Sequence, residues 1–177
     1  MALSLLVIVS DIDGEFLPEP PALEDLPEVI EHFHRVIKVD SRTLGGIEYE
    51  PDKDKRHRYL VGHGIDLAAT RLASEYSAQI TMAVGLSIGG VILWRAIERG
   101  LKVQSLLCFS STRLRFEKKA PQSGIKLYFG SNDQNRPDTH WHYSLGMNEN
   151  VVQGFGHEFY REPIGVDILR DHLKTLA

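Results

Sequence analysis

Six short apolar runs recur along the chain, and each has the length of a buried β-strand. The apolar residues in each run are mostly continuous rather than alternating, as is typical of strands that are covered on both faces. The runs lie at residues 5–9, 35–39, 80–84, 103–109, 125–129 and 150–153. This pattern predicts about six strands with a buried sheet between layers of other elements.

Between these runs, apolar residues recur at steps of three and four, which is the spacing of one helix face. Segments of this kind span residues 22–34, 59–76 and 88–99, and a fourth begins at Pro163. Gly100 directly after Arg99 is a typical C-terminal stop signal for the third of them. Two stretches without this spacing, residues 14–21 and 40–58, are predicted to be rich in loops.

The alternation of strands and helices predicts the fold class. It favours an α/β protein, a doubly wound three-layer sandwich around a mainly parallel sheet of about six strands. The length of 177 residues fits one domain, and the absence of a repeat or linker predicts a single domain over residues 1–177. In such sheets ligands bind beyond the carboxyl ends of the strands, so candidate site residues are expected there.

Charge and composition narrow the classes of partner. The chain has 20 Lys and Arg against 24 Asp and Glu residues, with no long run of either sign, which argues against nucleic-acid binding. The single cysteine, Cys108, excludes an intrachain disulfide and fits a reducing compartment. No apolar stretch approaches the roughly 20 residues of a membrane span, and the first run lacks the basic start of a signal peptide. We therefore expect a cytoplasmic protein with no membrane partner.

One glycine-rich segment carries the clearest candidate chemistry. The sequence GLSIGG at residues 85–90 follows a predicted strand and opens a predicted helix. In this context a G-x-S-x-G motif forms a tight turn that exposes the serine hydroxyl. Small residues are needed two positions before and after the serine, and Gly85 and Gly89 meet that need. Ser87 is therefore the candidate nucleophile, and a turn that only packs helix against strand is the alternative.

A serine hydroxyl becomes a good nucleophile only when a base removes its proton and an acid orients that base. Of the eight histidines, His157 is the favoured base because it ends the segment GFGH directly after the last predicted strand. Asp133 follows the strand at 125–129 within the segment GSND, and Asp138 is the second candidate for the acid. Capping of a turn is the alternative role for either aspartate.

In the order Ser87, Asp133, His157, these segments resemble the α/β-hydrolase superfamily, and the similarity covers the chain from Leu5 to the C-terminus. The resemblance implies a serine hydrolase that cleaves a small-molecule carboxylic ester or thioester through an acyl-serine intermediate. Ser87 would be the nucleophile, Asp133 the orienting acid and His157 the general base, with no metal or other cofactor. The short intervals between these residues imply a minimal α/β-hydrolase fold without a cap domain.

The resemblance also implies an oxyanion hole. One donor would be the backbone N–H of Ile88, and the other would come from the loop after the first strand. Many members carry His-Gly in that loop, whereas this chain has SDIDG at residues 10–14, so the N–H of Asp11 or of Ile12 is the candidate. A carboxylate near the oxyanion would destabilise the developing negative charge. Losing one oxyanion donor typically costs about 10²–10³ in rate. This departure predicts a slow or unusual hydrolase.

Two alternative functions arise from the same sequence. Residues 6–14 also resemble the first motif of haloacid-dehalogenase-type phosphatases, in which Asp11 would attack phosphorus, Asp13 would act as acid and base, and Mg²⁺ would assist. Glu15 departs from that motif, and the phosphatase interpretation leaves GLSIGG and GFGH without a role. A non-catalytic binding protein on a hydrolase fold is the other alternative.

A basic segment, residues 113–119, follows the predicted strand at 103–109. Lids are often inserted at this point in α/β-hydrolases, so the segment is expected near the site. It is interpreted either as a solvated loop or as a feature that favours an acidic acyl group or a carrier phosphate.

Overall fold

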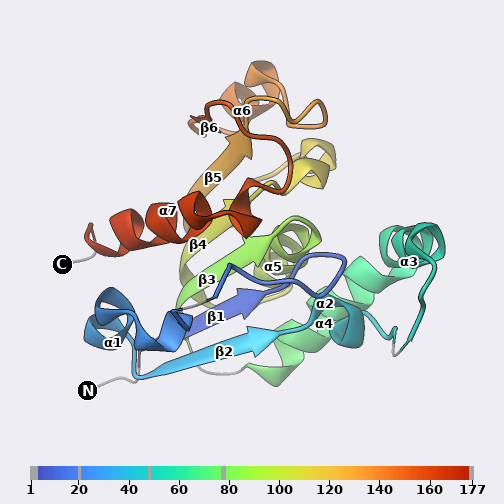
Figure 1. The fold of residues 1–177 in the computed structure, drawn as a ribbon. Helices are drawn as coiled ribbons and strands as arrows, with labels where there is room; N and C mark the ends of the chain where they lie inside the picture. Colours follow the sequence, from blue (N-terminus) through green and yellow to red (C-terminus); the bar gives the residue numbers. More distant parts are fainter. Residues whose placement is uncertain (1–3, 20, 48, 77–78, 176–177) are drawn as a thin grey trace.

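The computed structural model describes residues 4–19, 21–47, 49–76 and 79–175. Its strands form one six-stranded sheet in the order β2-β1-β3-β4-β5-β6, and every neighbouring pair is parallel (Figure 1). The strands are β1 (Leu5–Val9), β2 (Arg35–Val39), β3 (Ile80–Leu86), β4 (Val103–Phe109), β5 (Gly124–Gly130) and β6 (Asn150–Val152). The predicted parallel sheet of about six strands is confirmed.

Helices cover both faces of this sheet, so the predicted three-layer sandwich is confirmed as well (Figure 1). One face carries α1 (Pro27–His32) and α7 (Pro163–Leu173), and the other carries α4 (Ile65–Glu75) and α5 (Ile88–Glu98). Successive residues of a strand point to opposite faces, so Leu6 and Val7 of β1 belong to two different buried clusters. Together these clusters give the sheet an apolar core on each side.

The single helix predicted over residues 22–34 is wrong. The structure has a 3₁₀ turn, η1 (Leu23–Asp25), followed by the separate short helix α1. Leu26 between them is extended, because the ring of Pro27 disfavours a helical conformation in the residue before it. Ile30 in α1 is 64% exposed, so the apolar spacing over residues 22–34 does not mark one buried helix face.

The polar stretch 40–58 contains two helices, where the pattern predicts loops. They are α2 (Ser41–Leu44) and α3 (Lys53–Tyr59), and their N-termini are capped by the side chains of Asp40 and Asp52. No residue of α3 is buried, so it shows no apolar periodicity that could reveal it. Helix α3 continues through a π-helical segment, η2 (Leu60–Gly64), into α4.

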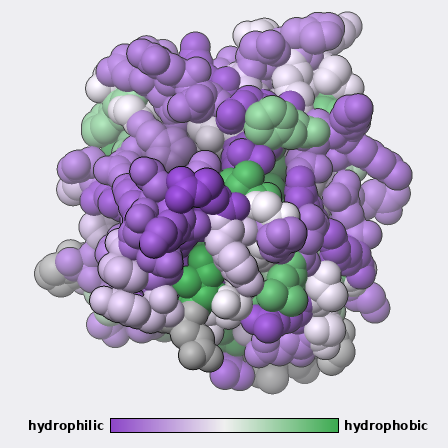
Figure 2. Space-filling model, turned by 90° about the vertical axis from the view of Figure 1, so that its right-hand side faces the viewer, coloured by the Kyte–Doolittle hydropathy of each residue, from purple (hydrophilic) through white to green (hydrophobic). Residues whose placement is uncertain are grey.

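The strand order places a crevice beside the end of β1. From β1 the chain passes to β2 on one side of the sheet and then to β3 on the other, and such a reversal opens a crevice at the carboxyl ends of the two central strands. Figure 2 turns the right-hand side of Figure 1 toward the viewer, and this face is mostly hydrophilic with a few apolar residues near its middle. The candidate site residues lie at this edge.

Only a short 3₁₀ helix, η3 (Thr112–Phe116), and loops join β4 to β5. The described part of the chain therefore has no cap domain over the sheet, as the short intervals predict. Within the same described residues, no helix has both the length and the apolar character needed to cross a bilayer.

Candidate active site

Ser87 lies at the sharp turn between β3 and α5. Its backbone has a φ of 49° and a ψ of −111°, a strained conformation for a residue other than glycine. A Cβ on Gly85 would lie 2.3 Å from the backbone of the first turn of α5, and one on Gly89 would lie 2.4 Å from the carbonyl oxygen of Val9. The two glycines therefore allow the chain to turn tightly and α5 to approach β1.

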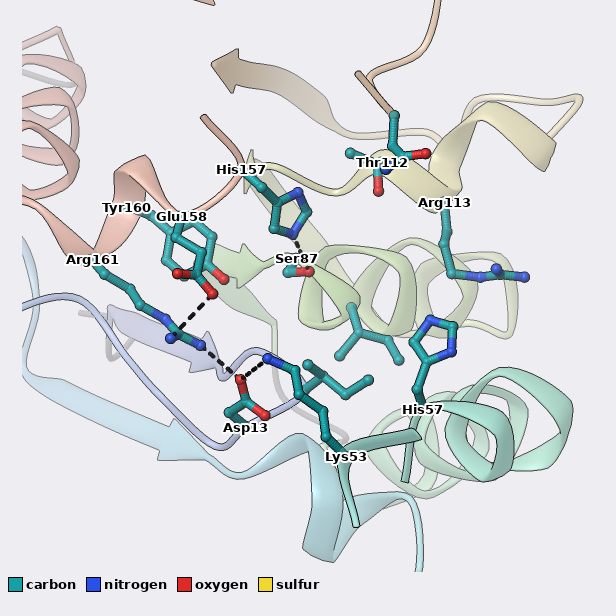
Figure 3. Close-up of a pocket in the computed structure, with 13 residues that line it drawn as sticks. Asp13, Lys53, His57, Ser87, Thr112, Arg113, His157, Glu158, Tyr160 and Arg161 are labelled. Atoms are coloured by element: carbon teal, nitrogen blue, oxygen red, sulfur yellow. Dashed lines mark hydrogen bonds and ion pairs between the residues drawn. The ribbon is translucent and has the colours of Figure 1, made fainter. Parts of the chain in front are cut away.

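The structure brings the three predicted side chains into one hydrogen-bonded chain. Ser87 Oγ lies 2.9 Å from His157 Nε2 (Figure 3). His157 Nδ1 lies 2.6 Å from Asp133 Oδ2. The three residues follow β3, β6 and β5, so they meet at one edge of the sheet although 70 residues separate the serine from the histidine. This geometry allows His157 to accept a proton from Ser87 while Asp133 holds its ring.

The carboxyl group of Asp133 is held ionised. Burial alone would raise its pKa, but hydrogen bonds from His157 and from the backbone N–H of Asn135 lower the pKa below its ordinary value of 3.8. Asp138, the second candidate for the acid, instead accepts a hydrogen bond from the N–H of Trp141 at 2.7 Å and caps α6 (Thr139–Ser144).

Two residues that line the cavity with Ser87 have backbone N–H groups without an acceptor among the described residues. Ile88 is the first residue of α5, so its N–H has no carbonyl partner within the helix. Ile12 lies in the loop after β1, and its N–H has no acceptor among the described residues. Both residues line the cavity that contains Ser87. The N–H of Asp11 donates to the carbonyl of Glu15 at 3.1 Å, so it is not free to serve as an oxyanion donor.

The carboxylate of Asp11 is fully buried and completely hydrogen-bonded. Its Oδ2 accepts from the Tyr160 hydroxyl at 2.9 Å and from Arg161 Nη2 at 2.5 Å. Its Oδ1 accepts from the backbone N–H groups of Asp13 and Glu15, both at 2.9 Å. The negative charge that the sequence places beside the oxyanion loop is thus balanced by Arg161, and the same bonds fold the loop.

Tyr160 and Arg161 are site residues that sequence reasoning missed. They belong to a 3₁₀ helix, η4 (Phe159–Arg161), that follows His157 directly, about 150 positions after Asp11. Burial and the charge of Asp11 raise the pKa of Tyr160, so its hydroxyl remains a donor. No motif marks either residue, and only the folded chain brings them to Asp11.

Asp13 is also engaged by basic groups. It contacts Arg56 at 2.5 Å, Arg161 at 3.1 Å and Lys53 at 3.2 Å. Burial would raise its pKa, but the hydrogen bonds from these three groups lower it. With Asp11 buried and Asp13 bonded in this way, neither aspartate is placed for the roles that the phosphatase alternative requires. Among the described residues, no group of three or more His, Cys, Asp or Glu side chains could hold a metal ion.

A cavity of about 270 Å³ opens above Ser87. His157, Tyr160 and Arg161 line one side of it, and His57 and Arg113 line another (Figure 3).

Cys108 is buried, which raises the pKa of its thiol to about 12, so this thiol stays protonated.

Solved structures with the same architecture identify the fold. An alpha/beta-superfamily hydrolase from Xanthomonas campestris matches with a TM-score of 0.62 at 13% identity, over 98% of this chain and 97% of its own. The esterase PE8 matches with a TM-score of 0.59 at 18% identity, over 99% of this chain and 94% of its own. The chain has the α/β-hydrolase fold.

A third structure with the α/β-hydrolase fold is a serine hydrolase involved in carbazole degradation. It matches with a TM-score of 0.56 at 12% identity, over 99% of this chain and 92% of that one. No family model and no curated protein matches the sequence. The resemblance drawn from three short motifs is therefore confirmed at the level of the α/β-hydrolase fold.

Proposed function

We propose that this protein is a serine hydrolase that cleaves a carboxylic ester or thioester through an acyl-Ser87 intermediate. The observation that carries the proposal is the hydrogen-bonded chain from Ser87 through His157 to Asp133 at a strained turn. Esterases and other hydrolases among the structures of the same fold agree with it.

In the acylation step, Ser87 Oγ attacks the substrate carbonyl carbon while His157 Nε2 takes the hydroxyl proton. The resulting imidazolium is stabilised by the ionised carboxylate of Asp133. The tetrahedral intermediate then collapses, the bond to the leaving alcohol or thiol breaks, and His157 returns the proton to that leaving group. The acyl group remains as an ester on Ser87.

In the deacylation step, a water molecule takes the place of the leaving group. His157 removes a proton from the water as its oxygen attacks the acyl carbon. The second tetrahedral intermediate collapses, the carboxylic acid leaves, and His157 returns the proton to Ser87 Oγ. The enzyme is then restored with no net change.

Both intermediates carry a negative oxygen that needs hydrogen-bond donors. We assign this role to the N–H groups of Ile88 and Ile12, which are free and adjacent to the cavity. Because Asp11 is paired with Arg161, its negative charge is balanced and does not oppose an oxyanion beside the loop after β1. The unusual SDIDG loop is thus compatible with turnover.

The test is hydrolysis of p-nitrophenyl acetate and p-nitrophenyl thioacetate by the unmodified protein and two serine variants. We expect Ser87→Ala to lower kcat by at least about 10⁴, because loss of the nucleophile costs about as much as loss of the whole triad. Ser110→Ala is the matched control, because Ser110 also follows a strand and also has a φ of 49°, but its hydroxyl is buried. Equal rates of hydrolysis in both variants would exclude Ser87 as the nucleophile, and no hydrolysis by a folded unmodified protein would favour the non-catalytic binding alternative.

A further inference from the structure

The cavity above Ser87 is lined by more basic than acidic side chains. Figure 3 shows the charged groups around it, and they come from the loop after β1, from α3, from η3 and from the segment after His157. Besides His157, the basic groups are Lys53, His57, Arg113 and Arg161, and the acidic groups are Asp13 and Glu158.

The two acidic groups are already paired with cations on one side of the cavity. Asp13 contacts Arg161, Arg56 and Lys53, and Glu158 Oε1 lies 3.3 Å from Arg161 Nη1. The negative charge that lines the cavity is therefore balanced locally. Within the described structure, neither acidic group forms an ion pair with a basic group on the other side of Ser87.

Arg113 and His57 lie on the other side of Ser87. Figure 3 shows both of them across Ser87 from Arg161. Among the described residues, neither side chain makes an ion pair or a hydrogen bond. The guanidinium carbon of Arg113 lies 5.0 Å from the ring centre of Phe116, a cation–π contact that uses none of its N–H groups as hydrogen-bond donors.

The surroundings of Arg113 disfavour its positive charge. Burial and the nearby positive charges of Arg115 and Arg95 lower the pKa of Arg113, and the carboxylate of Glu117, which is paired with Arg95, offsets this only in part. Arg115, two residues further on, differs because it donates to the carbonyl oxygens of Thr112 at 2.8 Å and Asn135 at 3.2 Å. Arg115 thus holds η3 in place, whereas Arg113 has a charge that a bound anion would compensate.

We infer that Arg113 and His57 bind an anionic oxygen group of the substrate, a carboxylate or a phosphate, while the scissile carbonyl lies at Ser87. This inference rests on the proposed function and adds a substrate class to it. The planar guanidinium matches both groups with paired hydrogen bonds. Arg113 and His57 line the same cavity of about 270 Å³ as Ser87, so one substrate can contact all three residues.

Two pairs of substrates test the inference and separate the two anions. Mono-p-nitrophenyl succinate is compared with p-nitrophenyl 4-methylpentanoate, which carries a branched alkyl group where the succinate has its carboxylate. S-acetyl-4′-phosphopantetheine is compared with S-acetylpantetheine, which lacks the phosphate. The measured quantity is the ratio of kcat/KM for the anionic and the neutral member of each pair, because a general loss of active protein cancels in this ratio.

We expect the unmodified protein to favour the anionic member of one pair by about tenfold or more, and Arg113→Gln to lower that ratio by about tenfold, as for the loss of a charge-assisted hydrogen bond. His57→Gln lowers the same ratio. Lys118→Gln is the matched control, since it removes one positive charge from the same segment at an exposed position outside the cavity, and it leaves the ratio within twofold.

Each outcome decides between these interpretations. A preference confined to the succinate pair identifies a carboxylate, and one confined to the pantetheine pair identifies a phosphate. Ser87-dependent hydrolysis of the neutral substrates, with both ratios near one or unchanged by Arg113→Gln, would overturn the inference and leave the proposed function intact. No Ser87-dependent hydrolysis of any of the four substrates would overturn both.

Discussion

At the scale of single residues, the proposed catalysis depends most on how Asp133 holds His157. The hydrogen bond of 2.6 Å between them fixes which ring nitrogen faces Ser87. Replacing the carboxylate with an amide removes the charge and favours the wrong tautomer, so we expect Asp133→Asn to lower kcat for p-nitrophenyl acetate by about 10⁴. Asp138→Asn is the control, because asparagine also caps a helix, and it should change kcat by less than threefold or so. Equal losses in the two variants would exclude Asp133 as the orienting acid.

The same carboxylate makes stability depend on pH in a defined direction. Although burial alone would raise its pKa, hydrogen bonding brings the pKa of Asp133 below 3.8 in the folded state, so its contribution is fully present above about pH 4. That contribution is lost as the pH falls below 3.8 toward the folded pKa. We therefore expect urea unfolding to show a steeper loss of stability below about pH 4 in the unmodified protein than in Asp133→Asn. Parallel curves for the two proteins would contradict this assignment.

At the scale of elements, the contact between Asp11 and Arg161 joins the loop after β1 to η4, directly after His157. Asp11 is fully buried, so removing its cation leaves an uncompensated charge in the core. We expect Arg161→Met to lower the free energy of unfolding in urea by about 3 kcal/mol.

The control for this contact is Arg136→Met. Arg136 makes a looser pair with Glu149, at 3.6 Å, and its side chain is 36% exposed. Its loss should cost less than about 1 kcal/mol. If the two arginine variants were destabilised equally, the contact with Asp11 would not hold the two loops together.

Replacing a glycine with alanine is expected to have opposite effects at two helical positions, one where α5 packs against β1 and one with open space around it. A Cβ on Gly89 would lie 2.4 Å from the carbonyl oxygen of Val9, so Gly89→Ala must push α5 away from the sheet and destabilise the protein. Gly62 is a helical residue with open space around its Cβ position, so Gly62→Ala should raise stability by about 0.5–1 kcal/mol. Thermal unfolding of both variants measures this difference, and a stabilised Gly89→Ala would show that the approach of α5 to β1 is looser than described.

The elements also show why some features could be predicted from the sequence and others could not. A buried parallel strand must be apolar on both faces, so the inner strands β1, β3 and β4 appear as apolar runs, whereas the edge strands β2 and β6 are only partly buried and give shorter or interrupted runs. The strained turn at Ser87 requires glycines at fixed positions, so it appears as a motif. The exposed helix α3 leaves no such pattern, and the pairing of Asp11 with Arg161 joins residues 150 positions apart. Only the folded chain brings Asp11 and Arg161 together.

At the scale of the whole molecule, the small cavity and the missing cap limit the substrate. A cavity of about 270 Å³ is smaller than the roughly 300–1,000 Å³ of pockets that enclose drug-sized ligands. No cap domain in the described residues extends it over a long acyl chain. We expect kcat/KM for p-nitrophenyl acetate to exceed that for p-nitrophenyl laurate by more than about tenfold, measured below the concentration at which the laurate forms micelles. A rise in kcat/KM with chain length would contradict this view of the site.

The most direct test of the central claim is to trap the acyl-enzyme. The protein is mixed with excess p-nitrophenyl acetate, quenched in acid within the first turnovers, digested and sequenced by mass spectrometry. We predict acetylation of Ser87 in the unmodified protein and in Ser110→Ala, and no acetylated peptide from this segment in Ser87→Ala. Hydrolysis that continues in Ser87→Ala, or an acetyl group trapped on a different side chain while Ser87 stays unmodified, would contradict the account.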